Sequence, residues 1–442
     1  MAQKDGMNYA PKGIPAPVVK EGEFPFAAVG LDHGHIYGMT NGLLDAGATL
    51  KWVYDPDPAK MQAFKARYPQ VRLAESEEQV LADPAVKLVA GACVTSERAA
   101  LGVRVMRAGK DYFTDKAPLT TLEQLAMVKN VVAETGRKYA VSYSERLQVE
   151  AAVYAGELVK AGAIGRVVQV IGMGPHRLNP ASRPAWFFEK EKYGGILCDI
   201  GSHQIEQFLF YTGAEDATIV NAKIANYAHP EYPELDDFGD ATLVGDNGAS
   251  GYFRVDWFTP DGLRSWGDGR TFLLGTDGYI ELRKYLDVAR SAEGNHVFWV
   301  DKAGEHYEDV TGKVGFPYFG QLILDCLNRT ENAMTQAHAF KAAELCVKAQ
   351  LLATDLTGSS EAFPRRGILR LCRKSSGKGL VFAKSRVYNK TVARSCVQWG
   401  PGGRIWAAAL LRAGALCAKK GETENVGYQG HAHRCAETKA AG

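Results

Sequence analysis

With 442 residues, the chain is longer than one compact core usually accommodates, so its length predicts two domains with additional segments. No window approaches the roughly 20 uninterrupted apolar residues of a membrane helix, and the first residues lack a signal-peptide pattern, which argues against membrane association and predicts a cytoplasmic location. The net charge of +2 conceals an uneven distribution. Residues 363–442 are basic, with 16 Lys+Arg against 3 Asp+Glu, and residues 1–362 are acidic, with 36 Lys+Arg against 47 Asp+Glu. The acidic charge of residues 1–362 argues against nucleic acid as the partner of the main fold.

The first part of the chain alternates strands with helices. Residues 1–23 are polar and contain three prolines, so they predict an extended arm. In residues 24–145, buried strands are expected at residues 26–29, 50–54, 88–94, 111–114 and 138–142, with helices such as 97–108 and 122–134 between them. This alternation predicts an α/β domain whose doubly wound parallel sheet is covered by helices on both faces.

From about Arg146 the pattern changes, and residues 146–362 are expected to form a second domain. A helix with Val149, Val153, Gly156 and Val159 on one face ends at Gly162. Strand-like runs follow at residues 167–171, 218–224, 251–258, 271–274, 279–282 and 297–300. Many strands with few helices predict a large, mostly antiparallel sheet.

Two helices close this second domain. The first has an apolar stripe made of Phe319, Leu322, Ile323, Cys326 and Leu327. The second has a stripe of small residues that would permit close packing, made of Ala339, Ala342, Cys346, Ala349 and Ala353.

The eight cysteines are scattered along the chain. They form no CxxC pair and show no Cys/His spacing typical of a zinc site. We therefore expect reduced thiols, and neither disulfides nor a metal site.

Residues 363–442 form a basic tail with one short apolar run, residues 405–411, which Arg412 interrupts. Three interpretations are open: a disordered basic extension, a tail attracted to nucleic acid or membranes, and out-of-frame translation past the true stop. Trp399 and Trp406 are too few among the basic residues to form a stacking platform, which favours an extension without functional structure.

The segment Gly194–His203, with the sequence GGILCDIGSH, has the most informative spacing in the chain. It places Asp199 and His203 four residues apart around Gly201, and apolar residues then recur at helical intervals. We expect a strand-to-helix junction with His203 in the first helical turn, where the helix dipole favours a neutral imidazole and an ionised Asp199. The alternative is structural: Asp199 caps the helix and His203 is a core residue.

The first strand runs into the sequence GLDHGH, residues 30–35, where a dinucleotide-binding fold has its phosphate-binding turn. A G-x-G-x-x-G motif would require glycine in place of Asp32 and His35, so an ordinary turn is the alternative. We expect the Asp32 side chain to point away from the pyrophosphate. Asp55 ends the second strand, 25 residues after Gly30, and suits a carboxylate that binds the ribose hydroxyls and repels a 2′-phosphate. This position favours NAD over NADP.

Together, three segments resemble the Gfo/Idh/MocA family of oxidoreductases, named for glucose-fructose oxidoreductase, inositol dehydrogenase and a rhizopine-catabolism protein. The most specific segment is residues 194–203. The second is Ala-Gly-Lys at 108–110 followed by Asp-Lys-Ala-Pro-Leu at 115–119, similar to the family's AGKH and EKPL segments, although Ala117 separates the lysine from the proline. The third is Gly-Thr-Asp-Gly at 275–278, similar to the family's GT(E/D)G turn. The resemblance covers about residues 24–357.

The resemblance implies an N-terminal Rossmann domain that binds NAD and a C-terminal α/β domain whose open sheet forms a homodimer or homotetramer. It implies substrates that are sugars, cyclitols or their derivatives, and a catalytic trio of Lys116, Asp199 and His203. His203, with an unperturbed pKa near roughly 6.5, would accept the hydroxyl proton, Asp199 would orient its ring, and Lys116 would hydrogen-bond the substrate oxygen. Cofactor contacts are expected from Gly30, Asp32, His33, Gly34, His35, Asp55 and Lys116.

Five further residues flank these segments and are candidates for the substrate pocket: Tyr143, Arg146, His176, Arg183 and Trp186. Aromatic planes and charged donors suit polyhydroxylated rings, although each residue taken alone is as compatible with a structural role.

Two other functions are open. Some members of the same family use bound NAD transiently to cleave a glycosidic bond, and a cofactor that is not consumed would indicate that reaction. A non-catalytic sugar or nucleotide sensor is the other, and retention of the trio argues against it.

Overall fold

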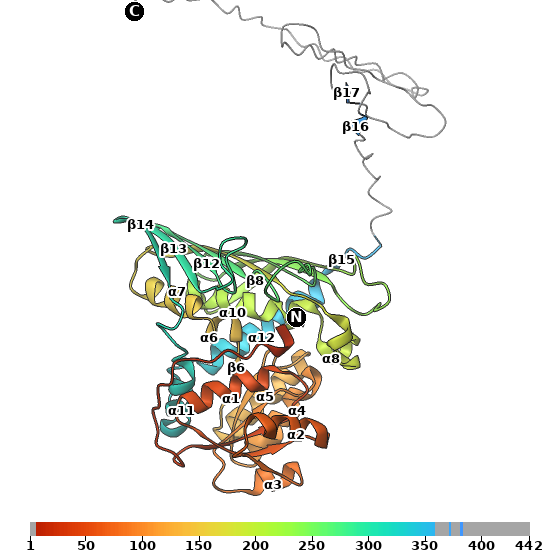
Figure 1. Ribbon diagram of the computed structural model, residues 1–442, viewed down its shortest axis with the longest axis vertical. Helices are drawn as coiled ribbons and strands as arrows, with labels where there is room; N and C mark the ends of the chain where they lie inside the picture. Colours follow the sequence, from red (N-terminus) through yellow and green to blue (C-terminus); the bar gives the residue numbers. More distant parts are fainter. Residues whose placement is uncertain (1–5, 359–370, 373–380, 383–442) are drawn as a thin grey trace, which may run out of the picture. The chain divides into compact units, whose positions relative to one another are not determined.

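The computed structural model of the chain describes residues 6–358, 371–372 and 381–382 (Figure 1). The chain divides into two units, residues 1–362 and 363–442. In the second unit, strands β16 (Leu371–Cys372) and β17 (Val381–Phe382) pair antiparallel. The rest of the predicted basic tail lies outside the described residues, so its expected lack of functional structure stays a prediction. Within the described ranges, no helix is both long and apolar enough to cross a membrane.

The first domain contains a six-stranded parallel sheet with helices between its strands, as the alternating pattern predicts (Figure 1). In chain order the strands are β1 (Pro25–Val29), β2 (Thr49–Tyr54), β3 (Arg72–Leu73), β4 (Leu88–Gly91), β5 (Asp111–Asp115) and β6 (Tyr139–Ser142). The helices are α1 (His35–Asp45), α2 (Pro58–Arg67), α3 (Glu77–Ala82), α4 (Arg98–Arg107) and α5 (Leu122–Thr135). The order β3-β2-β1-β4-β5-β6 reverses beside β1, and ligands of such sheets bind at the carboxyl ends of the strands at this point.

Local chemistry fixes several ends in this domain. Thr121 caps the start of α5 by accepting a hydrogen bond from the amide of Gln124, and Gly136 ends the helix with φ at 63°. Strand β4 ends at Gly91, three residues before the predicted end at 94. The residues directly after it are buried but pair with no strand. An apolar run alone cannot distinguish a buried strand from a buried loop.

The second domain contains a nine-stranded, mostly antiparallel sheet with the order β14-β13-β12-β11-β7-β10-β9-β8-β15, which confirms the predicted class. Its strands are β7 (Val167–Pro175), β8 (Ala217–Ala225), β9 (Phe238–Gly245), β10 (Ser250–Asp256), β11 (Arg270–Gly275), β12 (Tyr279–Arg283), β13 (His296–Asp301), β14 (Gly304–Asp309) and β15 (Thr354–Asp355). Strand β7 pairs in parallel with β10, and β8 with β15. Strands β9, β14 and β15 were not predicted, and β14, with the sequence GEHYED at the sheet edge, has no apolar pattern to reveal it.

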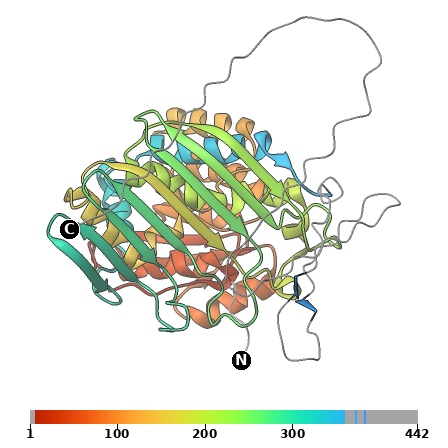
Figure 2. The same cartoon turned by 90° about the horizontal axis from the view of Figure 1, so that it is seen from above.

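Helices cover one face of this sheet, and Figure 2 shows the other face uncovered within the described residues. The helices of this part of the chain are α6 (Ser144–Leu147), α7 (Glu150–Lys160), α8 (Lys190–Tyr193), α9 (Ile196–Asp199), α10 (Gly201–Thr212), α11 (Tyr318–Asn328) and α12 (Gln336–Leu352). Of these, α11 packs against α1 of the first domain and not on the sheet (Figure 1). The predicted small-residue stripe of α12 is buried from Ala339 to Ala349. Two predicted stripes are partly wrong. In α7 the buried residues include alanines 151, 152 and 155. Of the predicted stripe, Val149 is buried at the N-cap and Val159 packs partly buried against the core, whereas Val153 and Gly156 are only partly buried. Leu327 of α11 is exposed.

One continuous core joins the two domains. Cys93, Cys198, Cys326 and Cys346 are free and buried in it, as expected for reduced thiols. The N-terminal arm, residues 6–23, runs along α1 on the outside of this core. Its Ala16 and Val18 amides bond to the carbonyls of Asp45 and Ala46 at the end of α1, and its first turn, η1 (Gly6–Asn8), reaches the start of α1.

Candidate active site

An ion pair joins the two domains at the carboxyl end of β5. Lys116 follows β5, and its Nζ lies 2.5 Å from Oδ1 and 3.4 Å from the backbone oxygen of Asp199. Both side chains are buried or nearly so, at 5% and 13% exposure. Burial alone would raise the pKa of Asp199, but the Lys116 charge outweighs it and lowers that pKa. The carboxylate is therefore held ionised, as the sequence predicts, although by an ion pair more than by a helix dipole.

The chain reaches Lys116 through an unusual turn. The peptide between Lys116 and Ala117 is cis, and both carbonyl oxygens accept hydrogen bonds from the guanidinium of Arg98 on α4. Arg98 is itself buried and also pairs with Asp115 at 3.2 Å. The extra alanine that separates this lysine from Pro118 therefore has its backbone held in place by α4.

The motif segment forms two helices in place of the predicted strand-to-helix junction. Asp199 ends the short helix α9, and α10 begins two residues later, so His203 lies in the first turn of α10 as expected. The N-cap of α10 is Ile200, which has no side-chain hydrogen bond, so Asp199 does not cap this helix. Gly195 has φ at 85°, and a Cβ there would lie 2.2 Å from Gln350, so only glycine fits that approach.

His203 is buried and neutral. Burial lowers its pKa to about 3, well below the unperturbed value that the sequence suggested. Its Nδ1 has no hydrogen-bond partner among the described residues. The expected contact from Asp199 is therefore not formed, because that carboxylate pairs with Lys116 instead.

A second carboxylate, missed in the sequence, lies beside this group. Glu145 of α6 is buried and pairs with Lys284, just after β12, through Nζ and Oε2 at 3.0 Å. Its other oxygen, Oε1, lies 4.0 Å from Nε2 of His176, at the end of β7. Burial lowers the pKa of His176 to about 4. Glu145 could have been found from the sequence, because it directly precedes the predicted Arg146 after a strand of the parallel sheet. Nothing in the local sequence singles out Lys284.

The other predicted pocket residues divide into two groups. Trp186 lies in the 3-10 helix Ala185–Phe188 and Arg183 just before it, both ahead of α8. The Arg183 charge contributes, after those of Lys116 and His176, to lowering the pKa of Asp199. Arg183 also covers the rings of Phe187 and Trp257. In contrast, the Tyr143 hydroxyl donates to the carbonyl of Ala339 on α12, and Arg146 pairs with buried Glu206, so the structure engages both polar groups in the domain core.

The phosphate turn follows β1, at the point where the sheet order reverses. Gly30 has φ at 73°, and a Cβ there would lie 2.7 Å from that of Cys93. Asp55 is buried at the end of β2, and its two oxygens accept hydrogen bonds from the amides of Leu31 and Asp57. Asp55 therefore holds the turn itself.

Beside this turn is a cavity of about 470 Å³ that borders Gly30, Asp32 and Tyr54. Its acidic lining is Asp32, Glu77, Glu78 and Glu97, opposed by Arg104. Asp32 bonds to Nζ of Lys60 at 2.5 Å and to the amide of Val94 at 3.3 Å. A cavity next to a glycine turn at the sheet's reversal point fits the adenosine half of a dinucleotide.

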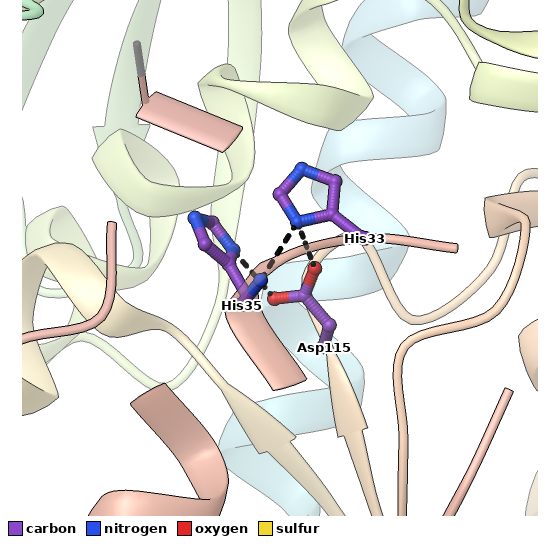
Figure 3. A group of neighbouring side chains, drawn as sticks. All are labelled: His33, His35 and Asp115. Atoms are coloured by element: carbon purple, nitrogen blue, oxygen red, sulfur yellow. Dashed lines mark hydrogen bonds and ion pairs between the residues drawn. The ribbon is translucent and has the colours of Figure 1, made fainter. Parts of the chain in front are cut away.

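The two histidines of the turn face Asp115, the last residue of β5 (Figure 3). His35 Nδ1 lies 3.0 Å and His33 Nδ1 lies 3.5 Å from the carboxylate oxygens of Asp115. The three ligand atoms lie within 4.8 Å of one another, although the sequence predicted no metal site. The Arg98 guanidinium already compensates Asp115, and the His35 amide bonds to His33 Nδ1 at 3.2 Å, so these groups are engaged with each other.

The N-terminal arm ends over this region. The carbonyl of Gly6 accepts a hydrogen bond from Nε2 of His35 at 3.2 Å, and a Cβ on Gly6 would lie 3.0 Å from the ring of His176. Tyr9 packs against Trp266 and Tyr285, with ring centroids 5.6 Å apart in both cases. The arm thus connects the phosphate turn to the second domain.

Comparisons with known proteins match both domains. Residues 28–143 match a family model described as "Oxidoreductase family, NAD-binding Rossmann fold", and residues 153–281 match the GFO/IDH/MocA C-terminal domain. A scyllo-inositol 2-dehydrogenase (NAD(+)) from Bacillus subtilis is 26% identical over 258 residues, which cover 56% of this chain and 71% of that protein. A D-xylose dehydrogenase from Paenarthrobacter nicotinovorans is 27% identical over 209 residues, covering 46% of this chain and 52%, about half, of that protein.

Solved structures agree with this assignment. A protein from Erwinia carotovora atroseptica SCRI1043, with a provisional oxidoreductase description, is 53% identical, with a TM-score of 0.73, over 75% of this chain and 99% of that one. A levoglucosan dehydrogenase in complex with NADH and levoglucosan shares the fold at 17% identity, with a TM-score of 0.60 over 74% of this chain and 96% of that one. With both family models matched and a close structural relative covered almost entirely, the chain belongs to the Gfo/Idh/MocA family of oxidoreductases, and its first domain is an NAD-binding Rossmann fold.

Proposed function

We propose that this protein is an NAD-dependent dehydrogenase that transfers hydride between nicotinamide and a secondary hydroxyl-bearing carbon of a sugar, cyclitol or derivative. The observation that carries this proposal is the buried group of Lys116, ionised Asp199 and neutral His203 at the junction of the two domains. Relatives named as inositol and xylose dehydrogenases support it.

Oxidation of a secondary alcohol removes a hydride from carbon and a proton from oxygen. When bound, the nicotinamide cofactor would supply the hydride acceptor. His203 is neutral and has a free ring nitrogen, so it can accept the proton. Lys116, held by Asp199, would donate a hydrogen bond to the substrate oxygen and stabilise its developing negative charge.

For the cofactor, we propose contacts from the turn at Gly30–His35, with Asp32 and Asp55 at the adenosine end and Lys116 at the nicotinamide end. Asp55 holds the amide of Leu31, and the cavity lining beside it is mostly acidic. Negative charge around the adenosine ribose disfavours a 2′-phosphate, so NAD is preferred over NADP. For the substrate, we retain His176, Arg183 and Trp186 as contacts.

We also propose a homodimer or homotetramer through the uncovered face of the large sheet. Strands β9 to β12 and β14 carry exposed large apolar residues, namely Val244, Tyr252, Leu274, Tyr279 and Tyr307. Exposed apolar groups of this kind mark interaction surfaces when they gather on one face.

Turnover assays test the proposed activity. Purified protein with NAD would be incubated with a panel of sugars and cyclitols while NADH absorbance is followed. We expect NADH formation in proportion to substrate with at least one panel member. Release of a free sugar from a glycoside without net NADH would favour the hydrolase alternative, and tight sugar binding without either reaction would favour a sensor.

A further inference from the structure

The site contains a buried carboxylate oxygen that the proposed hydride transfer does not use. Glu145 is 2% exposed, and its Oε1 has no hydrogen-bond partner among the described residues. Buried polar atoms in folded proteins are almost always paired, and the exceptions cluster where a ligand supplies the partner. This oxygen is therefore a candidate ligand contact.

The rest of the Glu145 carboxylate is held rigidly. Its Oε2 accepts hydrogen bonds from Lys284 Nζ and from Gln204 Nε2, each at 3.0 Å. Lys284 is fully buried and also donates to Gln207 at 2.7 Å. Burial would raise the pKa of Glu145, but the Lys284 charge reverses this and lowers it to about 2. Glu145 thus presents an ionised acceptor in a fixed direction.

His176 presents a second acceptor beside it. Its Nδ1 lies 3.1 Å from the carbonyl of Gly174, which can only accept, so Nδ1 carries the proton. In the neutral ring, Nε2 is then a lone pair that faces Glu145 Oε1 at 4.0 Å. Two acceptors cannot bond to each other, but each can accept from the O–H group of a different ligand hydroxyl.

This pair lies next to the proposed reacting group. The charges of Lys116 and Asp199 both act on His176, and those of Glu145, Lys116 and His176 act on His203. The geometry agrees, because Gln204, the residue after His203 on α10, donates to Glu145 Oε2 at 3.0 Å.

We propose that Glu145 Oε1 and His176 Nε2 bind neighbouring hydroxyl groups of the substrate, and that they select uncharged polyols over carboxylated ones. This rests on the proposed function, because it assumes a polyhydroxylated substrate. Two neighbouring hydroxyl groups, each with one O–H donor, satisfy the two acceptors, whereas a substrate carboxylate in this position brings further acceptors and a repelling charge. Glu145, held in place by Lys284, then determines which substrates are accepted.

Calorimetric titration of the NADH-loaded protein tests this binding site. The probes are myo-inositol and D-xylose as uncharged polyols, and D-glucuronate as a carboxylated one. We expect at least tenfold tighter binding of one uncharged probe than of D-glucuronate. Glu145→Gln should weaken polyol binding about tenfold and reduce the difference in affinity between polyols and D-glucuronate. The reason is that the introduced amide group can donate to His176 Nε2 and so occupy the position of a substrate hydroxyl.

A second variant separates binding from folding. Glu145→Gln leaves Lys284 charged without its partner, so Glu145→Gln/Lys284→Met removes both charges and should show the same loss with an intact melting transition. Glu150→Gln, at a buried carboxylate on α7 that holds backbone amides, is the matched control with unchanged binding. NADH affinity should be unchanged in all three.

The outcomes distinguish this inference from the proposed function. Polyol binding that depends on Glu145, without any NADH formation from NAD, would support the inference and contradict the dehydrogenase. NADH formation with unchanged polyol affinity in both Glu145 variants would support the dehydrogenase and overturn the inference. Wild-type protein that binds D-glucuronate as tightly as the polyols, or that binds no polyol, would also overturn it.

Discussion

Lys116 and Asp199, 83 residues apart in the chain, meet across the domain junction with Nζ and Oδ1 2.5 Å apart. One residue follows a Rossmann strand, and the other ends a short helix of the second domain. The ammonium group of Lys116, which we propose contacts the substrate, is therefore oriented by a residue of the second domain. Its position depends on how the two domains meet.

Lys116→Met should reduce kcat/KM about 10²–10³-fold, because a positioned charge donor to the substrate oxygen is lost. Steady-state kinetics with the best panel substrate would measure the change. Lys129→Met is a matched control, since Lys129 is an exposed lysine of α5 whose nearest carboxylate is 3.9 Å away. Comparable losses in both variants would contradict a role for Lys116 in the site.

His203→Ala should remove most turnover, by about 10²–10⁴-fold, while NAD affinity stays nearly unchanged. The imidazole is expected to act on the substrate hydroxyl and not on the dinucleotide. Calorimetry with NAD and initial rates would be measured on the same preparation. His306→Ala, at a partly exposed histidine on β14, should keep wild-type rates. A His203→Ala variant with near wild-type kcat would show that this histidine is structural.

NAD should bind at least about tenfold more tightly than NADP. Asp32→Asn should narrow this difference, because it releases Lys60, now 2.5 Å from Asp32, to pair with a 2′-phosphate. Asp32→Asn/Lys60→Met should then lose the gain in NADP affinity. Titration of each variant with both cofactors would measure these constants. Tighter NADP binding to the wild type would contradict the acidic-cavity argument, and no binding of either would contradict the assigned cofactor site.

Stability should fall as the solution is acidified below neutrality. Burial lowers the pKa of His203 to about 3 and that of His176 to about 4, so the unfolded chain binds protons near pH 6.5 that the folded chain refuses. Their contribution is therefore constant above pH 6.5 and is lost as pH falls toward 4. Together, the two histidines can lower the free energy of unfolding by up to about 2.7 kcal/mol for each pH unit of acidification.

Urea unfolding at pH 7, 6 and 5 would measure this slope. His176→Gln should remove up to about half of this slope, because one of the two buried histidines is lost. Glu145, whose pKa is lowered to about 2, adds its own loss only below about pH 4.5. An unfolding free energy that is equal at pH 7 and pH 5 would show that these imidazoles are accessible to protons.

Truncation after Ser360 should leave the melting temperature and turnover essentially intact. The removed segment is strongly basic, with 16 Lys+Arg against 3 Asp+Glu in residues 363–442, and has one short apolar run. Thermal unfolding and initial rates of the two lengths would be compared. A loss of several degrees, or of activity, would mean that the tail packs on the main fold.

Much of the fold could be predicted because its signals are local. Alternating apolar runs and helical intervals gave both sheets, and Thr121 and Gly136 delimit α5 as caps should. Strand β14 could not be predicted, because an edge strand with polar residues on both sides has no periodic pattern. The alanine face of α7 was missed for a related reason: valines dominate a hydropathy pattern, whereas close packing selects small side chains.

The candidate site was predictable only as far as single segments reach. The spacing around Gly201 identified Asp199 and His203 as site residues. The predicted contact, in which Asp199 orients the His203 ring, is not formed. In the structure Asp199 pairs with Lys116, and Glu145 lies near the histidines with Lys284 behind it. Those pairings depend on how the two domains meet, and no spacing along the chain encodes that contact. The contact of the Tyr143 hydroxyl with α12, 196 residues away along the chain, could not be predicted for the same reason.

The first turn of the chain also determines how the protein should be prepared for any of these measurements. The Gly6 carbonyl bonds to His35, and Gly6 lies close to His176. An affinity tag fused ahead of Met1 would therefore be only five residues away from Gly6. A change at Gly6 would therefore act on two histidines of the proposed cofactor and substrate sites at once. Kinetic constants are best measured on protein without an amino-terminal tag.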